Sequence, residues 1–396
     1  MAPRKRTTDA AVQKTTRRDD DAVDAAVVAM LIEWFLKHAR DLPWRASDPK
    51  TALRDPYRVL VSEVMLQQTQ VSRVEPKFRD FLTRFPTIRD LANAPESDVL
   101  AAWTGLGYYR RARMLHAAAK KVVEDFAGDV PRNVEALRSL PGIGAYTSGA
   151  IASLAHGEAS PLVDTNVSRV LLRLAGKPMK TSDPLAVEWC WAQATKLVRH
   201  AKELNAKLSR EKAINAPGAF NESLMELGAT VCTLSTPACN RCPVASRCAA
   251  FKAGIQDQIP LAPDPKKRTA IVHAVLVVRD ERKRVLVEPR SDAAHKNALW
   301  EGLWQAPTLE CAGAPKSAGA LAKKLGIDLE KERRFRKSHD FVFKTTLRDV
   351  RFVVWETEIE DGASLVRGSR TWKTLSEVES LAMSSPMRRI LIAKSK

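Results

Sequence analysis

Four cysteines lie within seventeen residues of this chain and could bind one metal centre. They are Cys232, Cys239, Cys242 and Cys248, in the spacing C-x6-C-x2-C-x5-C. Four thiolates can complete the coordination of a zinc ion or of an iron–sulfur cluster, and the spacing alone admits both. Such bunching is typical of metal chemistry in a reducing compartment rather than of a disulfide framework. The two other cysteines, Cys190 and Cys311, are expected to be ordinary buried thiols.

A turn rich in glycine could bind phosphate. The segment Leu140–Gly144 reads LPGIG and lies between helices predicted over 133–140 and 145–154. Proline and two glycines, Gly142 and Gly144, let the backbone turn tightly and present N–H groups beside a helix N-terminus, which suits a phosphate. A plain turn between helices is the structural alternative. The segment resembles the helix-hairpin-helix motif of DNA repair proteins.

Asp164 directly precedes a predicted helix. Apolar residues at helical spacing follow it, at Val167, Val170, Leu171 and Leu174. The helix N-terminus would stabilise an ionised carboxylate there, although a lone aspartate in this place is most often only an N-cap. Its position some twenty residues after the LPGIG turn resembles that of the catalytic aspartate in the endonuclease III superfamily.

Glu63 is the second candidate carboxylate. It lies at the edge of an apolar helix face formed by Tyr57, Leu60, Val61, Val64 and Met65. A carboxyl group held against apolar surface is partly desolvated, so its pKa rises and it becomes a candidate general acid near neutral pH. A glutamate that faces solvent is the structural alternative.

Three strings together resemble the adenine DNA glycosylases, the MutY family. They are Val61–Val71 (VSEVMLQQTQV), Leu42–Arg45 (LPWR) and Trp103–Arg113 (WTGLGYYRRAR). The resemblance covers nearly the whole chain beyond residues 1–22 and is strongest from about Arg40 to Cys248. It implies a mainly α fold, a two-lobed helix-hairpin-helix glycosylase body with an iron–sulfur loop, followed by an α+β Nudix-like domain. It also implies hydrolysis of the N-glycosidic bond of adenine mispaired with 8-oxoguanine or guanine in double-stranded DNA.

The resemblance implies roles for individual residues. Glu63 would protonate the departing adenine, and Asp164 would stabilise the oxocarbenium-like sugar, with a transient covalent adduct as one route. Tyr146 and Asn166 would support the site around the sugar and the acid. The extruded adenine would be bound by Arg40, Leu42, Trp44, Arg45 and Glu222, and the duplex would be entered beside the opposite base by Gln68 and Tyr108. Such cleavage needs an acid on the base and negative charge beneath a developing cation.

Tyr146 separates two types of glycosylase. Bifunctional relatives have a lysine two residues after the second glycine of the hairpin, and this lysine forms an imine with the sugar. Tyr146 occupies that position here, and its phenol cannot form an imine. Little or no lyase activity is therefore expected. A glycosylase for thymine opposite guanine can share this tyrosine, but the Ser62–Val71 string and the C-terminal region argue against it. A mismatch-binding protein without catalysis is a third alternative, and intact Glu63 and Asp164 argue against it.

For the cysteines, the resemblance implies a [4Fe–4S] cluster with a structural role. Its loop, residues 232–248, would direct Arg241 and Arg247 toward DNA phosphates. The bulk charge agrees with a polyanionic partner, since 64 Lys and Arg against 46 Asp and Glu give a formal net charge of +18. A basic surface without a specific partner is the alternative.

The chain is predicted to have four parts. Residues 1–22 would be a disordered basic arm, 23–255 the glycosylase domain, 256–268 a proline-rich linker and 269–396 the Nudix-like domain. No run of about eighteen apolar residues and no signal peptide are recognised, so no membrane association is expected. A monomer in the cytoplasm, associated with the nucleoid, is also expected, and the basic arm is compatible with a nucleus as the alternative.

The C-terminal part has its own pattern. Strands are predicted over 269–278, 284–288, 341–343 and 350–355, and helices over 318–325 and 375–382. The string WEGLWQAP at Trp300–Pro307 resembles the start of the Nudix-like domain, but no R-E-x-x-E-E hydrolase string follows it. Nucleotide hydrolysis is therefore not expected.

The resemblance is weaker where the opposite base would be recognised. The family reads 8-oxoguanine with a Phe-Ser-His loop, which aligns here with Phe341–Phe343. Val342 and Phe343 lack the hydroxyl and imidazole groups for hydrogen bonds. Ser338 and His339 could serve from a shifted register, other residues could do so, or discrimination could be weaker. Thr165 also departs from the family, in which glycine is common at this position.

Overall fold

The computed structural model describes residues 23, 25–48, 50–208, 213–264, 267–290, 299–329, 335–360 and 365–392. The arm predicted at residues 1–22 lies outside these ranges. Backbone contacts divide the chain into two compact units: Met1–Ala39 with Ala159–Pro263, and Arg40–Glu158 with Asp264–Lys396. Within the described ranges, no helix is both long enough and apolar enough to cross a membrane.

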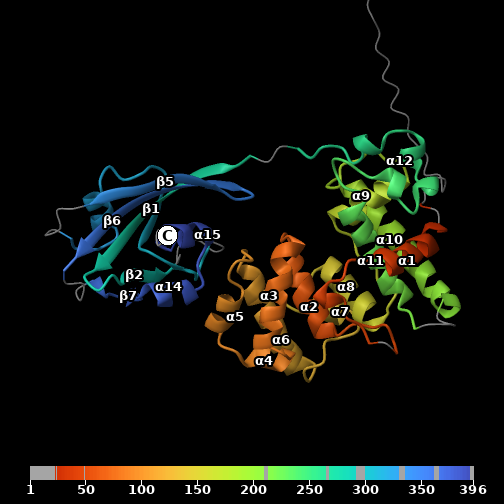
Figure 1. The fold of residues 1–396 in the computed structure, drawn as a ribbon, viewed down its shortest axis with the longest axis horizontal. Helices are drawn as coiled ribbons and strands as arrows, with labels where there is room; N and C mark the ends of the chain where they lie inside the picture. The colour runs from red at the N-terminus through yellow and green to blue at the C-terminus, as the bar shows by residue number, and fades with distance from the viewer. Residues whose placement is uncertain are drawn as a thin grey trace, which may run out of the picture. The chain divides into compact units, whose positions relative to one another are not determined.

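The first unit is helical and is built around one buried helix. That helix is α11 (Ala216–Thr230), which starts at the Asn215 cap with Pro217 in its first turn and is buried at nearly every position up to Gly228. Around it pack α1 (Val27–His38), α9 (Thr165–Leu174) and α10 (Pro184–Leu208). In Figure 1 the red helix α1 lies beside the green α10 and α11, although a long stretch of sequence separates them.

The cysteine-containing segment of this unit consists of short turns of helix. It contains η3 (Cys239–Arg241), η4 (Ala245–Arg247), α12 (Ala249–Lys252) and η5 (Gln256–Gln258). Of these, α12 packs against α9. The segment therefore relies on its neighbours for its shape, because turns this short supply few hydrogen bonds of their own.

The helices of the second unit surround α2 and α6. They are η2 (Pro43–Arg45), α2 (Pro56–Leu66), α3 (Val71–Arg84), α4 (Ile88–Asn93), α5 (Glu96–Ala102), α6 (Arg110–Asp125), α7 (Val134–Arg138) and α8 (Ala145–His156). Helix α2 packs against α8, and α4 and α5 pack against α6. The helices predicted on either side of the LPGIG turn are confirmed as α7 and α8.

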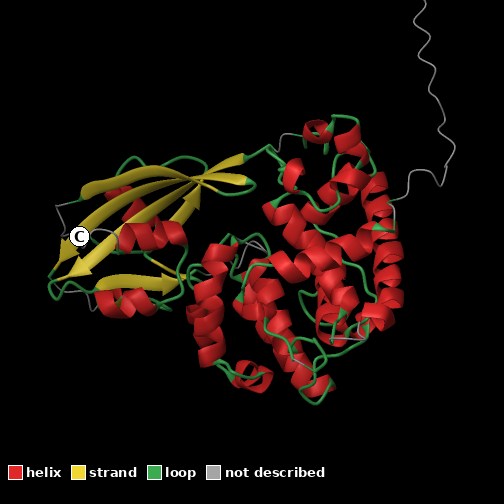
Figure 2. Cartoon of the chain, turned by 45° about the vertical axis from the view of Figure 1, so that its right-hand side comes forward, coloured by secondary structure: helices red, strands yellow, loops and turns green. Residues whose placement is uncertain are grey.

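The same unit contains a mixed β-sheet, drawn in yellow in Figure 2. Its strands are β1 (Thr269–Asp280), β2 (Val285–Pro289), β3 (Trp304–Gln305), β4 (Thr308–Cys311), β5 (Arg336–Lys344), β6 (Arg348–Ile359) and β7 (Thr371–Lys373). The main order is β3-β2-β1-β6-β5, with β4 paired to β1 and β7 paired to β2. Strands β1 and β6 run parallel from the Thr269–Arg348 pair to the Asp280–Ile359 pair, whereas the other pairings are antiparallel.

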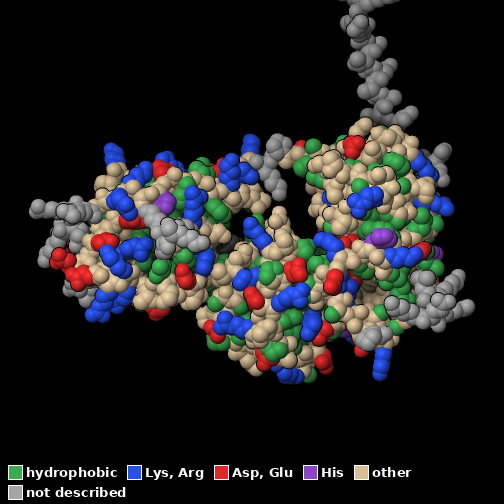
Figure 3. Space-filling view, in the orientation of Figure 1, with side chains coloured by type: hydrophobic (Ala, Val, Ile, Leu, Met, Phe, Trp, Pro, Cys, Tyr) green, Lys and Arg blue, Asp and Glu red, His purple; other side chains and the backbone are tan. Residues whose placement is uncertain are grey.

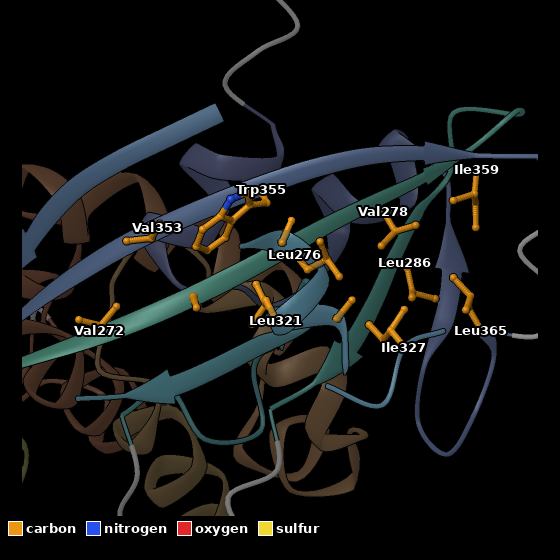
Figure 4. Close-up of a cluster of buried hydrophobic side chains, with 13 residues drawn as sticks. Val272, Leu276, Val278, Leu286, Leu321, Ile327, Val353, Trp355, Ile359 and Leu365 are labelled. Carbon is orange, nitrogen blue, oxygen red and sulfur yellow. The ribbon is translucent and has the colours of Figure 1, made fainter. Parts of the chain in front are cut away.

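Each face of the sheet has its own apolar core, because alternate residues of β1 point to opposite sides. Leu276 and Val278 face a cluster that includes α13 (Ala318–Lys324), as Figure 4 shows. Val275 and Val277 face the cluster formed with α14 (Leu375–Ser380) and α15 (Ser385–Leu391). The predicted strands and the two predicted helices of this region are all present, so the predicted class, helical and then α+β, is confirmed.

Candidate active site and cysteine loop

Glu63 lies deep in the second unit. Helix α2 begins at the Asp55 cap, whose side chain accepts a hydrogen bond from the Arg58 N–H, with Pro56 in the first turn. The residues on both sides of Glu63 are buried, and Glu63 itself is only 5% exposed. The alternative that this glutamate faces solvent is therefore wrong, since every residue from Val59 to Met65 is buried.

The LPGIG turn has the backbone geometry that a tight hairpin requires. Gly142 has φ +78°, and a Cβ there would lie 2.8 Å from the Cβ of Met114, so glycine is needed for both reasons. Gly144 is exposed and caps α8, and a Cβ at this residue would meet no heavy atom within 4 Å. Within the described residues no side-chain hydrogen bond caps the start of α8, and Tyr146 is half-buried in its first turn.

Four residues expected to bind adenine lie together before α2. Leu42 and Trp44 are buried, and the ring of Trp44 meets the edge of Phe78 at 5.5 Å between centroids. Arg45 donates a hydrogen bond to the carbonyl oxygen of Arg40 at 2.9 Å. Arg40 and Leu42 also line an open pocket beside the start of α3. The fifth residue, Glu222, belongs to the other unit, where it is buried in α11.

Asp164 and Asn166 meet at the start of α9 in the first unit. One carboxylate oxygen of Asp164 accepts a hydrogen bond from the Val167 N–H at 2.7 Å, and the other accepts one from Asn166 Nδ2 at 3.2 Å. Asp164 is thus the predicted N-cap, and both of its carboxylate oxygens accept hydrogen bonds. Thr165 is the first helical residue and is not among those with positive φ, so this loop does not need glycine there.

Two buried arginines of α9 connect this corner to the cysteine segment. Arg169 donates to Asn166 Oδ1 at 2.9 Å and to the carbonyl oxygens of Gly228 at 2.8 Å and Cys232 at 2.9 Å. One turn later, Arg173 donates to Cys232 Sγ at 3.3 Å and to three backbone carbonyl oxygens of the following segment. These arginines were not predicted from the sequence, where the only signal was charge within an apolar helical pattern.

The four cysteines line one apolar space between α9, α11 and the short helices. Burial raises the pKa of the Cys242 thiol to about 12 and also raises the pKa values of Cys239 and Cys248. A metal centre would therefore have to displace their protons on binding. Among the residues that the structure describes, no three His, Cys, Asp or Glu are grouped as a single metal ion would require. Arg241 and Arg247 are exposed on the same segment.

Gln68 lies just after the end of α2, and Tyr108 lies just before the start of α6. Both have left-handed backbone conformations, with φ +56° and +49°, and the Tyr108 side chain is 53% exposed. The hydroxyl of Tyr108 lies 3.1 Å from that of Thr346, in the turn between β5 and β6.

The strand β5 places the residues that align with the Phe-Ser-His loop. Phe341 and Phe343 lie within this strand rather than in a loop, and Phe341 stacks on Phe352 at 5.2 Å between centroids. Val342 is exposed on the other face. Ser338 and His339 lie at a bulge of the same strand and bond to each other at 3.1 Å. The turn that follows, Thr345–Leu347, is the loop of this hairpin.

Lysine and arginine side chains are spread over the face shown in Figure 3, with acidic side chains among them. The formal net charge of +18 favours a polyanionic partner. Charge alone does not mark the path of a nucleic acid on this face, so the individual residues above define the candidate site.

Comparison with known proteins gives two family matches. The HhH-GPD superfamily of base excision DNA repair proteins matches residues 61–189, and the NUDIX domain matches residues 274–393. The adenine DNA glycosylase of Mycolicibacterium smegmatis is 42% identical over 227 residues, which cover 57% of this chain and 70% of that protein. That of Buchnera aphidicola is 28% identical over 368 residues, 91% of this chain and 96% of that protein.

The adenine DNA glycosylase of Homo sapiens is 44% identical over 243 residues, which are 61% of this chain. The chain spans only 42% of the length of that relative.

Proposed function

Because the chain belongs to the adenine DNA glycosylase family, with its HhH-GPD and NUDIX parts, we propose that it removes adenine mispaired with 8-oxoguanine or guanine from duplex DNA. The bond hydrolysed is the N-glycosidic bond, and the activity is monofunctional. The observation that carries the proposal is the burial of Glu63, at 5% exposed, within the string that resembles the family. Water exclusion is what a general acid for a departing base needs.

The two carboxylates have different surroundings that suit different roles. Burial among apolar helix residues favours the protonated form of a carboxyl group, so Glu63 is the proposed acid that transfers a proton to the leaving adenine. Asp164 accepts two hydrogen bonds at a helix N-terminus, and these fix the position of its carboxylate group. It is the proposed stabiliser of the positive charge that develops on the sugar. Water then adds to the sugar carbon and gives its proton to the Glu63 carboxylate, which restores the acid for the next cycle.

The remaining site residues bind and orient the substrate. Asn166 holds one oxygen of Asp164, and Tyr146 lies in the first turn of α8, beside the proposed phosphate site at Gly142 and Gly144. Arg40, Leu42, Trp44 and Arg45 of the second unit and Glu222 of the first are the residues proposed to bind adenine. The base must leave the stack first, at a cost of roughly a few kcal/mol. Gln68 and Tyr108 are the proposed side chains that enter the duplex and offset this cost.

The turn between β5 and β6 is the proposed reader of the opposite base. The bond between Tyr108 and Thr346 supports this, because it brings a hydroxyl of the turn to the side chain proposed to enter the duplex. Thr345, Arg268 and Lys344 line the same pocket and could donate to a base or a phosphate. By contrast, the side chains of Phe341 and Phe343 pack against the apolar core on one face of the sheet.

The cysteine loop is proposed to hold a [4Fe–4S] cluster, which would supply structural support. The support for this proposal is that all four cysteines line one apolar space and that the chain belongs to a family in which such a cluster is expected. Cys232, Cys239, Cys242 and Cys248 would be its ligands. Arg241 and Arg247 would face DNA phosphates. We further propose a cytoplasmic, nucleoid-associated monomer with a glycosylase domain at 23–255 and a Nudix-like domain at 269–396.

Single-turnover base release from short duplexes tests this proposal. Adenine is placed opposite 8-oxoguanine, guanine or cytosine, and thymine opposite guanine is the fourth substrate. Adenine release that is fastest opposite 8-oxoguanine is expected, and Glu63→Gln should abolish release but retain duplex binding. Release of thymine alone, or no release by cluster-loaded protein, would refute the adenine assignment. Equal rates opposite 8-oxoguanine and guanine would refute the role of the β5–β6 turn.

A further inference from the structure

Arg111, near the start of α6, is a buried cation to which the proposed chemistry gives no role. It is 9% exposed, and its guanidinium bonds two separate segments. Nη1 donates to the carbonyl oxygens of Val64 and Met65, each at 2.9 Å, and to that of Gln67. Nη2 donates to Thr69 Oγ1 at 2.9 Å and to the carbonyl oxygens of Leu106 at 3.3 Å and Gly107 at 3.2 Å.

The first of these segments is the C-terminal end of α2. Helix α2 ends at Leu66, and the last carbonyl oxygens of a helix lack donors within the helix and carry its negative dipole end. Arg111 supplies those donors from a different helix. Burial lowers the pKa of Arg111 to about 10, so the guanidinium still carries its charge at neutral pH.

Both segments contain a strained residue next to the atoms that Arg111 binds. Gln68, with φ +56°, lies between Gln67 and Thr69, which are both bonded to the guanidinium. Tyr108, with φ +49°, directly follows Gly107, whose carbonyl oxygen is also bonded. Left-handed conformations of such residues are unfavourable and persist only where the surroundings hold them.

Aromatic rings also contact the Arg111 guanidinium. The guanidinium carbon of Arg111 lies 5.5 Å from the ring centroids of both Trp103 and Tyr108. The indole N–H of Trp103 donates to the carbonyl oxygen of Gly107 at 3.1 Å. Arg111 thus touches the Tyr108 ring directly and reaches Gln68 through both of its neighbours.

We propose that Arg111 is a positioning residue that holds Gln68 and Tyr108 as one rigid wedge for entry into the duplex. This inference rests on the proposed function. A planar fork with several fixed donors can bond both segments at once, whereas the ammonium of lysine is a single point charge with a different reach. The order of the wedge before DNA arrives reduces the entropy lost when the base is extruded.

A double-mutant cycle tests the proposal on the full-length, cluster-loaded protein. Arg111→Lys should slow single-turnover adenine release opposite 8-oxoguanine at least tenfold. In a background that already carries Gln68→Ala and Tyr108→Ala, the same substitution should slow release less than twofold, because no wedge remains to be positioned. Arg110→Lys, at the exposed preceding position of α6, is the matched control and should keep the wild-type rate.

The outcomes separate this inference from the proposed function. If the wild type releases no adenine, the proposed function fails. If the wild type is active and Arg111→Lys either equals it or lowers the rate by the same factor in both backgrounds, the positioning role is refuted. Thr69→Val covers the case in which Arg111→Lys does not fold, because it removes one hydrogen-bond acceptor of Arg111 and keeps the cation. The slowing caused by Thr69→Val should likewise disappear in the protein that already carries Gln68→Ala and Tyr108→Ala.

Discussion

Replacing Arg173 by methionine should loosen the segment that carries the cysteines. Arg173 is 2% exposed on α9, and it donates to the carbonyl oxygens of Thr233 at 2.6 Å, Leu234 at 2.9 Å and Ile259 at 2.7 Å. Methionine is also long and flexible, so it fills much of the same space, but it has no donor. The substitution therefore removes the hydrogen bonds while it keeps most of the packing.

The size of the effect follows from these contacts. Each carbonyl oxygen left without a donor costs about 1–3 kcal/mol, so three of them cost roughly 3–9 kcal/mol. Methionine avoids the desolvation cost of a buried guanidinium, which is several kcal/mol and offsets part of this loss. The expected net loss is about 3 kcal/mol in the free energy of local opening, or roughly a hundredfold in the opening equilibrium.

Hydrogen–deuterium exchange of peptides that cover residues 231–260 measures this loss directly. The amides of the Arg173→Met protein should exchange about a hundredfold faster there, while peptides from the sheet stay unchanged and serve as the internal reference. Arg241→Met is the matched control, since Arg241 is exposed on the same segment. It should change the opening free energy by less than about 0.5 kcal/mol. Exchange within threefold of the wild type in Arg173→Met would refute the idea that these bonds stabilise the segment.

Three further predictions concern the second unit. Borohydride should trap no DNA adduct on the wild type after adenine release, because the phenol of Tyr146 forms no imine. The Tyr146→Lys protein should give an adduct. Trapping of the wild type would contradict the monofunctional assignment. Tyr109→Phe removes the hydroxyl that donates to the Met383 carbonyl oxygen at 3.0 Å and should lower the free energy of unfolding by about 1 kcal/mol, measured in urea; an unchanged midpoint would argue against this bond. The Arg351 guanidinium beside Asp340 holds the pKa of that carboxyl well below its ordinary value near 4, so its stabilisation is complete above about pH 4 and is lost as the pH falls further. The difference in Tm between the wild type and Asp340→Asn should thus be larger at pH 6 than at pH 3, and the reverse order would refute this account.

The helical elements and the local part of the site could be predicted because their signals are local. The Asp164 cap, the LPGIG turn and the apolar run around Glu63 each depend on residues within a few positions of one another. Helix periodicity did not, however, show how deeply Glu63 is buried, since burial depends on the helices that pack on every side of α2.

The arginines could not be predicted, because most of their partners are backbone carbonyl oxygens. Arg111 binds atoms of residues more than forty positions earlier, and Arg173 binds atoms about sixty and eighty-six positions later. A carbonyl group is present at every residue, so no side-chain pattern marks these acceptors. The parallel register of β1 with β6 was likewise not predicted, because hydrophobic alternation identifies a strand and not its neighbour.

The first unit is formed by two separate parts of the sequence, Met1–Ala39 and Ala159–Pro263, and this has a consequence for biosynthesis. Helix α1 buries Val28, Leu31 and Ile32 against α10 and α11, which the ribosome makes well over a hundred residues later. At roughly 5–20 residues per second, the apolar side of α1 stays uncovered on the nascent chain for about ten seconds or longer. The inserted helices can form their local contacts during this time. Chaperones that bind exposed apolar helices would therefore meet α1 first, and a slower rate of translation through residues 40–158 would prolong that exposure.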